Sequence, residues 1–262
     1  MSVARFDQCI TARQTVAAGP IGYATRPSAS GFVLTTLRRS ALFSGVIDAT
    51  VLQCLNHANY QYFRRGAVIM RQGEPWRFIG IVCEGTLSII SGSAEGRDHL
   101  LYDVLPLEAF GELAALDDGV AFARATVISR TALVALMPRS TFLKAFATDA
   151  TLAKAIARIA AQRLRALAER STAQVSQSTL SRVAAAILPY ARPERGLRNA
   201  LPPLDVLGLA DLALAAGTVR EVAGRALKKL EKAHAIERAR GHVVRVDRER
   251  IYMFISGTAP AA

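Results

Sequence analysis

The chain has 262 residues, of which 51% are hydrophobic and 21% are charged, a balance that supplies a buried core and excludes an intrinsically disordered chain. Lys and Arg number 33 against 21 Asp and Glu, a net charge of +12. This excess favours a polyanionic partner, with nucleic acid ahead of an anionic membrane. No apolar run approaches the ~18 residues of a membrane helix, which excludes an integral membrane protein. Three cysteines (Cys9, Cys54 and Cys83) cannot pair evenly, so we expect no disulfide framework and a cytoplasmic location.

The positive charge is concentrated in the second half of the chain. Residues 1–136 hold 12 basic and 11 acidic residues, a net of +1. Residues 137–176 hold 7 and 2, a net of +5, and residues 177–262 hold 14 and 8, a net of +6. This asymmetry indicates one module that does not face nucleic acid and one that does, although basic helices can also be plain solvated surfaces.

Residues 1–36 lack periodicity and are punctuated by Gly and Pro, so we expect a flexible tail. Apolar spacing from Leu37 to about Gln61 predicts short helices. Between residues 62 and 136, short alternating apolar runs are separated by turn residues. Their length and spacing predict about eight strands of the usual ~5–6 residues in a sandwich or barrel.

From Arg139 the apolar period becomes helical, and residues 140–175 contain neither Gly nor Pro. An apolar stripe begins at Leu152 and continues through Ile156 and Ile159, then less regularly to Leu164. The pattern predicts one long helix over 139–176. Such a helix can be buried in a single core, or it can pair with a second copy of itself.

The last third of the chain predicts helices over 180–190, 208–216 and 219–233, followed by a β-hairpin. A turn at Gly217-Thr218 separates the second and third of these helices, which is the helix-turn-helix arrangement. In such a unit the start of the second helix enters the major groove. Arg220 and Arg225 can donate to guanine, and Glu221 can accept from cytosine. Residues suited to phosphate contacts are Thr218, Lys228, Lys229, Arg240 and His242.

Two sets of motifs resemble the Crp/Fnr family of bacterial transcription regulators. The C-terminal set runs from Asp211-Leu212-Ala213 through Arg220-Glu221 to Leu227-Lys228-Lys229-Leu230-Glu231 without a gap. The N-terminal set includes Gln72-Gly73-Glu74-Pro75 and Phe110-Gly111-Glu112-Leu113-Ala114. Both sets occur in the family's order and at its separation, and together they cover roughly residues 37–251.

This resemblance implies an α+β protein in four parts. They are a flexible tail (1–36), a jelly-roll-like β-roll of the double-stranded β-helix type that senses an effector (37–138), a long dimerisation helix (139–176) and a winged helix-turn-helix (177–256). The resemblance also implies that Arg220, Glu221 and Arg225 read bases. Double-stranded DNA, a second copy of the chain and RNA polymerase are the implied partners.

In the same family a Gly-Glu pair and a later Arg hold a cyclic nucleotide. Gly111 and Glu112 match the pair, but Arg124 lies one or two positions out of register, and such a slip turns a strand residue to the opposite face. The positions at which the family can carry adenine-contacting hydroxyls hold Leu167 and Ala168. Three interpretations stay open at this point: a reshaped cyclic AMP pocket, a different small effector, or a β-roll turn in which Glu112 only caps backbone amides.

Other chemistry finds little support in the sequence. Three scattered cysteines cannot supply the four-cysteine cluster of the Fnr branch, and Cys54 with His57 gives two ligands where zinc needs four. There is no nucleophile elbow, phosphate-binding Gly-rich loop or metal-binding helix motif, so we expect no enzyme, no metal and no certain cofactor. The alternative from another class is a ligand-sensing protein whose C-terminal unit serves protein contacts.

Overall fold

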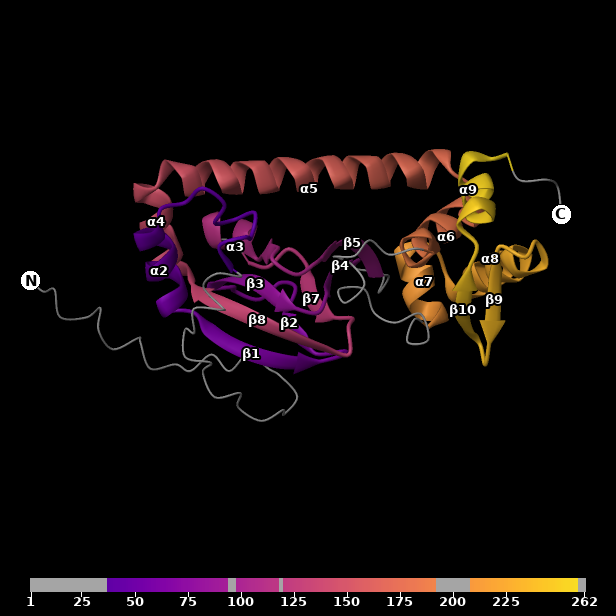
Figure 1. Cartoon of the computed structure of the whole chain (residues 1–262), viewed down its shortest axis with the longest axis horizontal. Coiled ribbons are helices and arrows are strands. Elements are labelled where there is room, and N and C mark those ends of the chain that lie inside the picture. Colours follow the sequence, from indigo (N-terminus) through magenta and orange to yellow (C-terminus); the bar gives the residue numbers. More distant parts are fainter. Residues whose placement is uncertain (1–36, 94–97, 118–119, 192–207, 259–262) are drawn as a thin grey trace, which may run out of the picture.

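The computed structural model describes residues 37–93, 98–117, 120–191 and 208–258. Its N-terminal part is a β-roll of two four-stranded antiparallel sheets with the strand orders β1-β8-β3-β6 and β2-β7-β4-β5 (Figure 1). The strands are β1 (Asn59–Arg64), β2 (Val68–Met70), β3 (Phe78–Glu84), β4 (Leu87–Gly92), β5 (Asp98–Val104), β6 (Ala109–Phe110), β7 (Arg124–Val127) and β8 (Thr131–Pro138). The predicted α+β class with an eight-stranded roll is confirmed.

The two sheets of the β-roll enclose one apolar core. Alternating strand residues point inward, so Val134 and Leu136 of one sheet join Leu87, Ile89 and Val127 of the other in a single buried cluster. Trp76, Phe110 and three alanines of the Ala121–Ala125 segment complete this cluster. The interior of the roll is therefore packed with the chain's own side chains.

The helical prediction for residues 37–61 is wrong at its C-terminal end. Helix α2 spans Asp48–Asn56, its C-cap is His57, and β1 begins at Asn59. Aromatic residues favour a pleated, half-buried surface, and Tyr60 and Phe63 are buried in β1. The helical segment therefore ends at Asn56, about one turn before the predicted end at Gln61.

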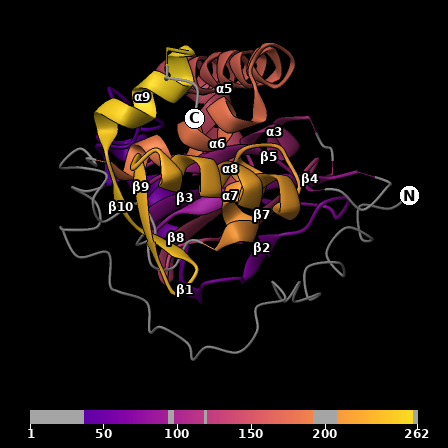
Figure 2. The same cartoon turned by 90° about the vertical axis from the view of Figure 1, so that its right-hand side faces the viewer.

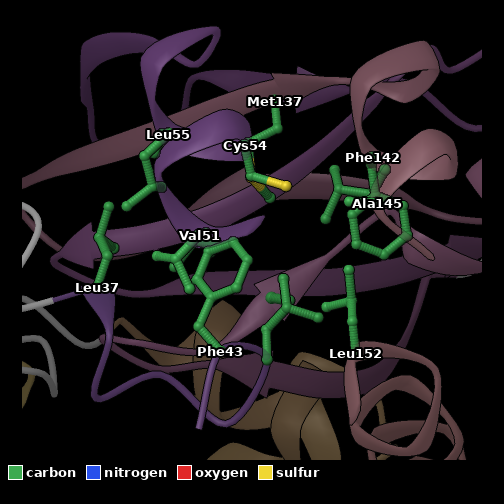
Figure 3. Close-up of a cluster of buried hydrophobic side chains, with 14 of the residues drawn as sticks. Leu37, Phe43, Val51, Cys54, Leu55, Met137, Phe142, Ala145 and Leu152 are labelled. Carbon is green, nitrogen blue, oxygen red and sulfur yellow. The ribbon is translucent and has the colours of Figure 1, made fainter. Parts of the chain in front are cut away.

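A second core lies between the β1-β8-β3-β6 sheet and the helices that cover it. Val51 and Cys54 of α2, Met137 of β8, Phe142 and Leu152 meet there with Phe43 (Figure 3). Cys54 is fully buried in this cluster. Burial raises the pKa of its thiol to about 11, so it behaves as a small hydrophobe.

The helix predicted over 139–176 is two helices, α4 (Arg139–Thr148) and α5 (Ala150–Ser176). The break falls at Asp149, whose backbone is extended (φ −116°, ψ 103°) and whose carboxylate accepts from the amides of Thr151 and Leu152. An N-cap of this kind starts a new helix, which explains the interruption. Helix α5 then runs for 27 residues along one side of the molecule (Figure 1).

The C-terminal unit has its own core and follows the predicted order. Its elements are α6 (Thr179–Ile187), the 3-10 turn η2 (Leu188–Tyr190), α7 (Leu209–Ala215), α8 (Arg220–Lys232), β9 (Ile236–Ala239), β10 (His242–Val246) and α9 (Arg248–Ser256). Helix α9, which was not expected from the sequence, packs on α6 through the buried Ile251. The predicted tail 1–36 lies outside the described residues.

Candidate nucleic-acid interface and effector site

Helices α7 and α8 form a helix-turn-helix whose turn is fixed by backbone geometry. Gly217 has a φ of +59°, a left-handed conformation that favours glycine, and the Thr218 amide donates to the carbonyl of Ala213 at 2.9 Å. A Cβ on Gly217 would lie 2.8 Å from Nε2 of Gln174 in α5. The turn is therefore packed directly against the end of the long helix.

Helix α8 separates its buried face from its polar face. Ala223, Ala226, Leu227 and Leu230 are buried in the C-terminal core. Arg220, Glu221 and Arg225, the predicted base-reading residues, are all exposed near the start of the helix. Glu221 and Arg225 are four residues apart and share one side. The structure thus brings the three side chains together on one exposed helix end.

The residues predicted to contact phosphates lie on the same unit. Lys228 and Lys229 are exposed along α8, and Arg240 is exposed in the turn between β9 and β10. Thr218 and His242 are half-buried. Seen end-on, the β9–β10 hairpin stands beside α8 as a wing (Figure 2).

The residues of the predicted effector site are each already in contact with other parts of the chain. Gly111 has a φ of +76° and precedes the short helix α3 (Glu112–Leu116). A Cβ at Gly111 would lie 2.2 Å from Nε1 of Trp76, so the indole ring covers this glycine. Glu112 is fully buried, and Nε of Arg163 in α5 lies 3.2 Å from its Oε1.

Arg163 ties α5 to the β-roll in three ways. Besides the ion pair with Glu112, its guanidinium donates to the carbonyl of Ala109 and lies 4.3 Å over the ring of Tyr102. Burial raises the pKa of Glu112 and Arg163 opposes this shift. Burial likewise raises the pKa of Tyr102 to about 12. Arg163 was not singled out from the sequence, because nothing in the local pattern distinguishes it from the other arginines of α5.

Arg124 does not join Glu112 in the structure. It begins β7 and forms a two-pronged ion pair with Asp98 of β5, with Nη1 2.8 Å from Oδ1. Its neighbours Ala123 and Ala125 point into the core, so Arg124 lies on the other face of the strand. The side chain of Arg124 therefore lies on the strand face that its register in the sequence predicts.

A cavity of ≈ 200 Å³ lies between β5 and α5. Its walls include Tyr102, Glu108, Gln162 and Arg163. Leu167, at a position where the family can carry a hydroxyl, is half-buried one turn further along α5, and Ala168 is exposed.

The C-terminal unit touches the β-roll directly, and α7 lies beside β5 (Figures 1 and 2). Arg65, in the turn after β1, donates to Oδ2 of Asp211 in α7 at 2.7 Å and to the Ile128 carbonyl at 2.7 Å. Arg170 of α5 donates to the carbonyls of Leu101 at 3.3 Å and Ala215 at 2.8 Å. Neither arginine was predicted to bridge the two parts, since their partners are far away in the sequence.

Metal-binding chemistry gains no support from these positions. Cys54 is buried, whereas His57 is exposed and its Nδ1 lies 2.8 Å from the carbonyl of Gln53. Across the described ranges, no three His, Cys, Asp or Glu side chains gather in a way that could hold a metal ion. Nor does any helix of that part of the chain have the length and apolar character needed to cross a membrane.

The chain is similar in sequence to known proteins over most of its length. Residues 60–149 match the cyclic nucleotide-binding domain family. The cyclic AMP receptor protein of Thermus thermophilus is 28% identical over 207 residues, which cover 79% of this chain and 93% of that protein. A CRP-like cAMP-activated global transcriptional regulator of Mycobacterium tuberculosis is 27% identical over 194 residues, or 73% of this chain and 85% of that protein.

Solved structures share the fold. FixK2 from Bradyrhizobium japonicum matches 78% of this chain and 98% of its own at 22% identity, with a TM-score of 0.61. A CRP/FNR-family transcriptional regulator from Thermus thermophilus matches 76% and 98% at 24% identity, also with a TM-score of 0.61.

The β-roll, the long helix and the helix-turn-helix unit together form the fold of these solved regulators, and the β-roll contains most of the match to the cyclic nucleotide-binding domain family. More specifically, the chain is similar over most of its length to CRP-type regulators, and the resemblance to the Crp/Fnr family drawn from its motifs is confirmed. One of these relatives is named as a receptor protein and the other as a transcriptional regulator, and neither is named as an enzyme.

Proposed function

We propose that this chain binds DNA in a sequence-specific manner, as a dimer on a palindromic site, and regulates transcription with RNA polymerase as a partner in the cytoplasm. Residues 37–138 act as the sensor domain, 139–176 as the pairing segment and 177–256 as the DNA-binding domain. The observation that carries the proposal is the exposure of Arg220, Glu221 and Arg225 on the second helix of a helix-turn-helix.

Charge supports the same assignment. The phosphate-contacting set flanks the base-reading residues on α8 and on the wing, which is how such units fix their register on a duplex. Val219 precedes α8 as an N-cap without a side-chain hydrogen bond, so the first amides of the helix remain available to a phosphate.

Dimerisation is supported by a second stripe on α5. Leu164 and Val175 are 70% and 89% exposed. They belong to a set of six exposed small or apolar residues spaced alternately by four and three. The set is Ala157, Ala161, Leu164, Ala168, Ser171 and Val175. This heptad spacing is the pattern of a two-stranded coiled coil, and a second α5 would cover it.

The proposal is tested by selecting a cognate site from random DNA and measuring affinity at fixed salt. Arg220→Ala should cost ~1–3 kcal/mol on the cognate site and relax base preference there. Lys228→Ala should weaken cognate and random DNA about equally, because a phosphate contact carries no sequence information. Arg248→Ala, an exposed arginine of α9 that stacks on Tyr252, is the charge-matched control.

Equal losses on both DNAs for Arg220→Ala would refute the base-reading assignment. Binding without any sequence preference would instead favour a C-terminal unit that serves protein contacts. Sedimentation of a Leu164→Glu variant tests the dimer, because a charge on the exposed stripe should leave monomers.

A further inference from the structure

The three residues that would hold a cyclic nucleotide are all engaged by other residues of the chain. Trp76 covers Gly111, Arg163 pairs with Glu112 and Asp98 pairs with Arg124. We propose that Trp76 is a built-in occupant of the nucleotide cradle, which excludes cyclic nucleotides and holds α3 and α5 together in their place. The test of this inference by DNA affinity rests on the proposed function, whereas its test by nucleotide binding does not.

The position of Trp76 leaves no room for a phosphate at Gly111. The ring is 8% exposed and packs edge-on against Phe78, with ring centroids 5.5 Å apart, and at a tilt against Phe110, with centroids 6.2 Å apart. A glycine at this place is needed for the close approach of the indole as well as for the positive φ. A nucleotide phosphate that used the backbone amides here would have to displace the indole.

The carboxylate and the cation of the cradle are also committed. Glu112 is fully buried with Nε of Arg163 3.2 Å from its Oε1, although neither carboxylate oxygen has a hydrogen-bond partner among the described residues, so a ribose hydroxyl would have to approach beside an ion pair. Arg124 is held by both oxygens of Asp98. Binding at Gly111 and Glu112 would therefore require the indole of Trp76 to move and the ribose to compete with Arg163, without help from Arg124.

The same contacts connect Trp76 to the DNA-binding unit. Trp76 rests on Gly111, Glu112 opens α3 and pairs with Arg163, and α5 runs from Arg163 to Gln174 at the helix-turn-helix turn. The first two steps are contacts between buried or half-buried groups, and the last is the continuous helix that ends beside the exposed turn at Gly217. Trp76 therefore supports α5 from inside the β-roll, where an effector would otherwise do so.

Trp76 is the single tryptophan of the chain, so intrinsic fluorescence reports on the cradle itself. Titration of the full chain with cyclic AMP and cyclic GMP up to millimolar concentration should give no binding heat and no change in the emission maximum. Saturable heat with a red shift would mean that the indole is displaced, and saturable heat without a shift would mean that it does not block the site. Either result overturns the proposal.

Substitution tests the supporting role. Trp76→Ala leaves a cavity and should lower the Tm and weaken cognate DNA binding by roughly tenfold, within the range of allosteric couplings. Indole should bind the cavity, raise the Tm and restore most of the DNA affinity. Phe142→Ala, which removes an equally buried aromatic ring from the other core, should lower the Tm without this indole-dependent change in DNA affinity. If Trp76→Ala does not fold, Trp76→Leu replaces it in the same measurements.

Failure of indole to restore either property, or unchanged DNA affinity in a folded Trp76 variant, would overturn the supporting role. If the natural chain itself binds no specific DNA, the proposed function fails. The nucleotide titration and the indole-dependent Tm would still decide whether Trp76 occupies the cradle.

Discussion

Replacing Arg163 by methionine should destabilise the protein in a strongly pH-dependent manner. Methionine keeps most of the apolar length of the side chain but removes the cation beside Glu112. The Glu112 side chain is 1% exposed and that of Arg163 is 12% exposed, so water cannot replace the lost partner. Removing one member of a buried pair costs ~3–5 kcal/mol, because the remaining charge is uncompensated.

The carboxyl group limits this cost by taking up a proton. A pH of 7 lies about 2.7 units above the ordinary pKa of a glutamate, so protonating Glu112 at that pH costs roughly 3.7 kcal/mol. At pH 5 the same step costs only about 1 kcal/mol. The contact of the guanidinium with Tyr102 adds about 1 kcal/mol at either pH. Because burial already raises the pKa of Glu112 in the natural chain, these sums are upper limits, and the expected loss is at most about 4–5 kcal/mol at pH 7 and at most about 2 kcal/mol at pH 5.

The direction of the pH dependence follows from the raised pKa of Glu112. Burial raises the pKa, Arg163 lowers it, and the variant loses the lowering influence. The folded variant then binds more protons than the unfolded chain between the ordinary pKa and the raised one. Its stability must fall as the pH rises through that window, and the deficit must grow from acid toward neutral pH.

Urea unfolding at pH 5 and pH 7 measures both values. Glu112→Gln combined with Arg163→Met should recover the pH-dependent part, since no buried charge remains. Arg158→Met removes an exposed arginine from the same helix and should show no such dependence. An equal deficit at the two pH values, or a double variant as unstable as the single one at pH 7, would refute the reasoning.

Three further outcomes are expected from the geometry. A double-mutant cycle of Arg65→Ala and Asp211→Asn should give a coupling of about 0.5–1 kcal/mol that weakens with added salt, because this ion pair is about one-third exposed. Gly80→Ala should lower the free energy of unfolding by about 1–3 kcal/mol, since the new Cβ would lie 2.1 Å from the ring of Phe110. Alkylation followed by mass spectrometry should leave Cys54 unlabelled at pH 8 until denaturant is added, because its pKa is about 11 and it is fully buried.

Each of these outcomes has a clear opposite. Additive effects at Arg65 and Asp211 would mean that the ion pair does not join the two parts in solution. A Gly80→Ala variant as stable as the natural chain would mean that the Phe110 ring can move aside. Rapid labelling of Cys54 without denaturant would show that α2 opens readily.

Helix α5 illustrates what a sequence pattern can and cannot give. The stripe of Leu152, Ile156 and Ile159 is buried on the β-roll as the periodicity indicates. Leu164 looks like its continuation, but it is 70% exposed, because it lies on another face of α5 while Arg163 and Arg170 still contact the β-roll. Tertiary packing decides which face of the helix is covered at each turn, and local periodicity contains no such information.

The effector site shows a second kind of limit. The sequence alone indicated that Arg124 faces away from Glu112, because the alternation of side chains along a strand is a local property. The partners that replace the missing contact, Arg163 for Glu112 and Trp76 over Gly111, come from remote segments. Their identity follows from tertiary packing, so it could not be read from either segment by itself.

The anchoring of α5 at one end gives it the properties of a lever. Its first half is buried on the β-roll, whereas the 13 residues that follow Arg163 extend about 20 Å further to the helix-turn-helix unit, with Arg170 as one more contact to β5. A tilt of about 10° at the anchor would move the far end by roughly 3.5 Å, close to the ~3.4 Å that DNA rises along its axis per base pair. An adjustment too small to disturb the packing of the β-roll would thus shift a reading helix by about one base pair, and in a dimer it would change the spacing between the two reading helices.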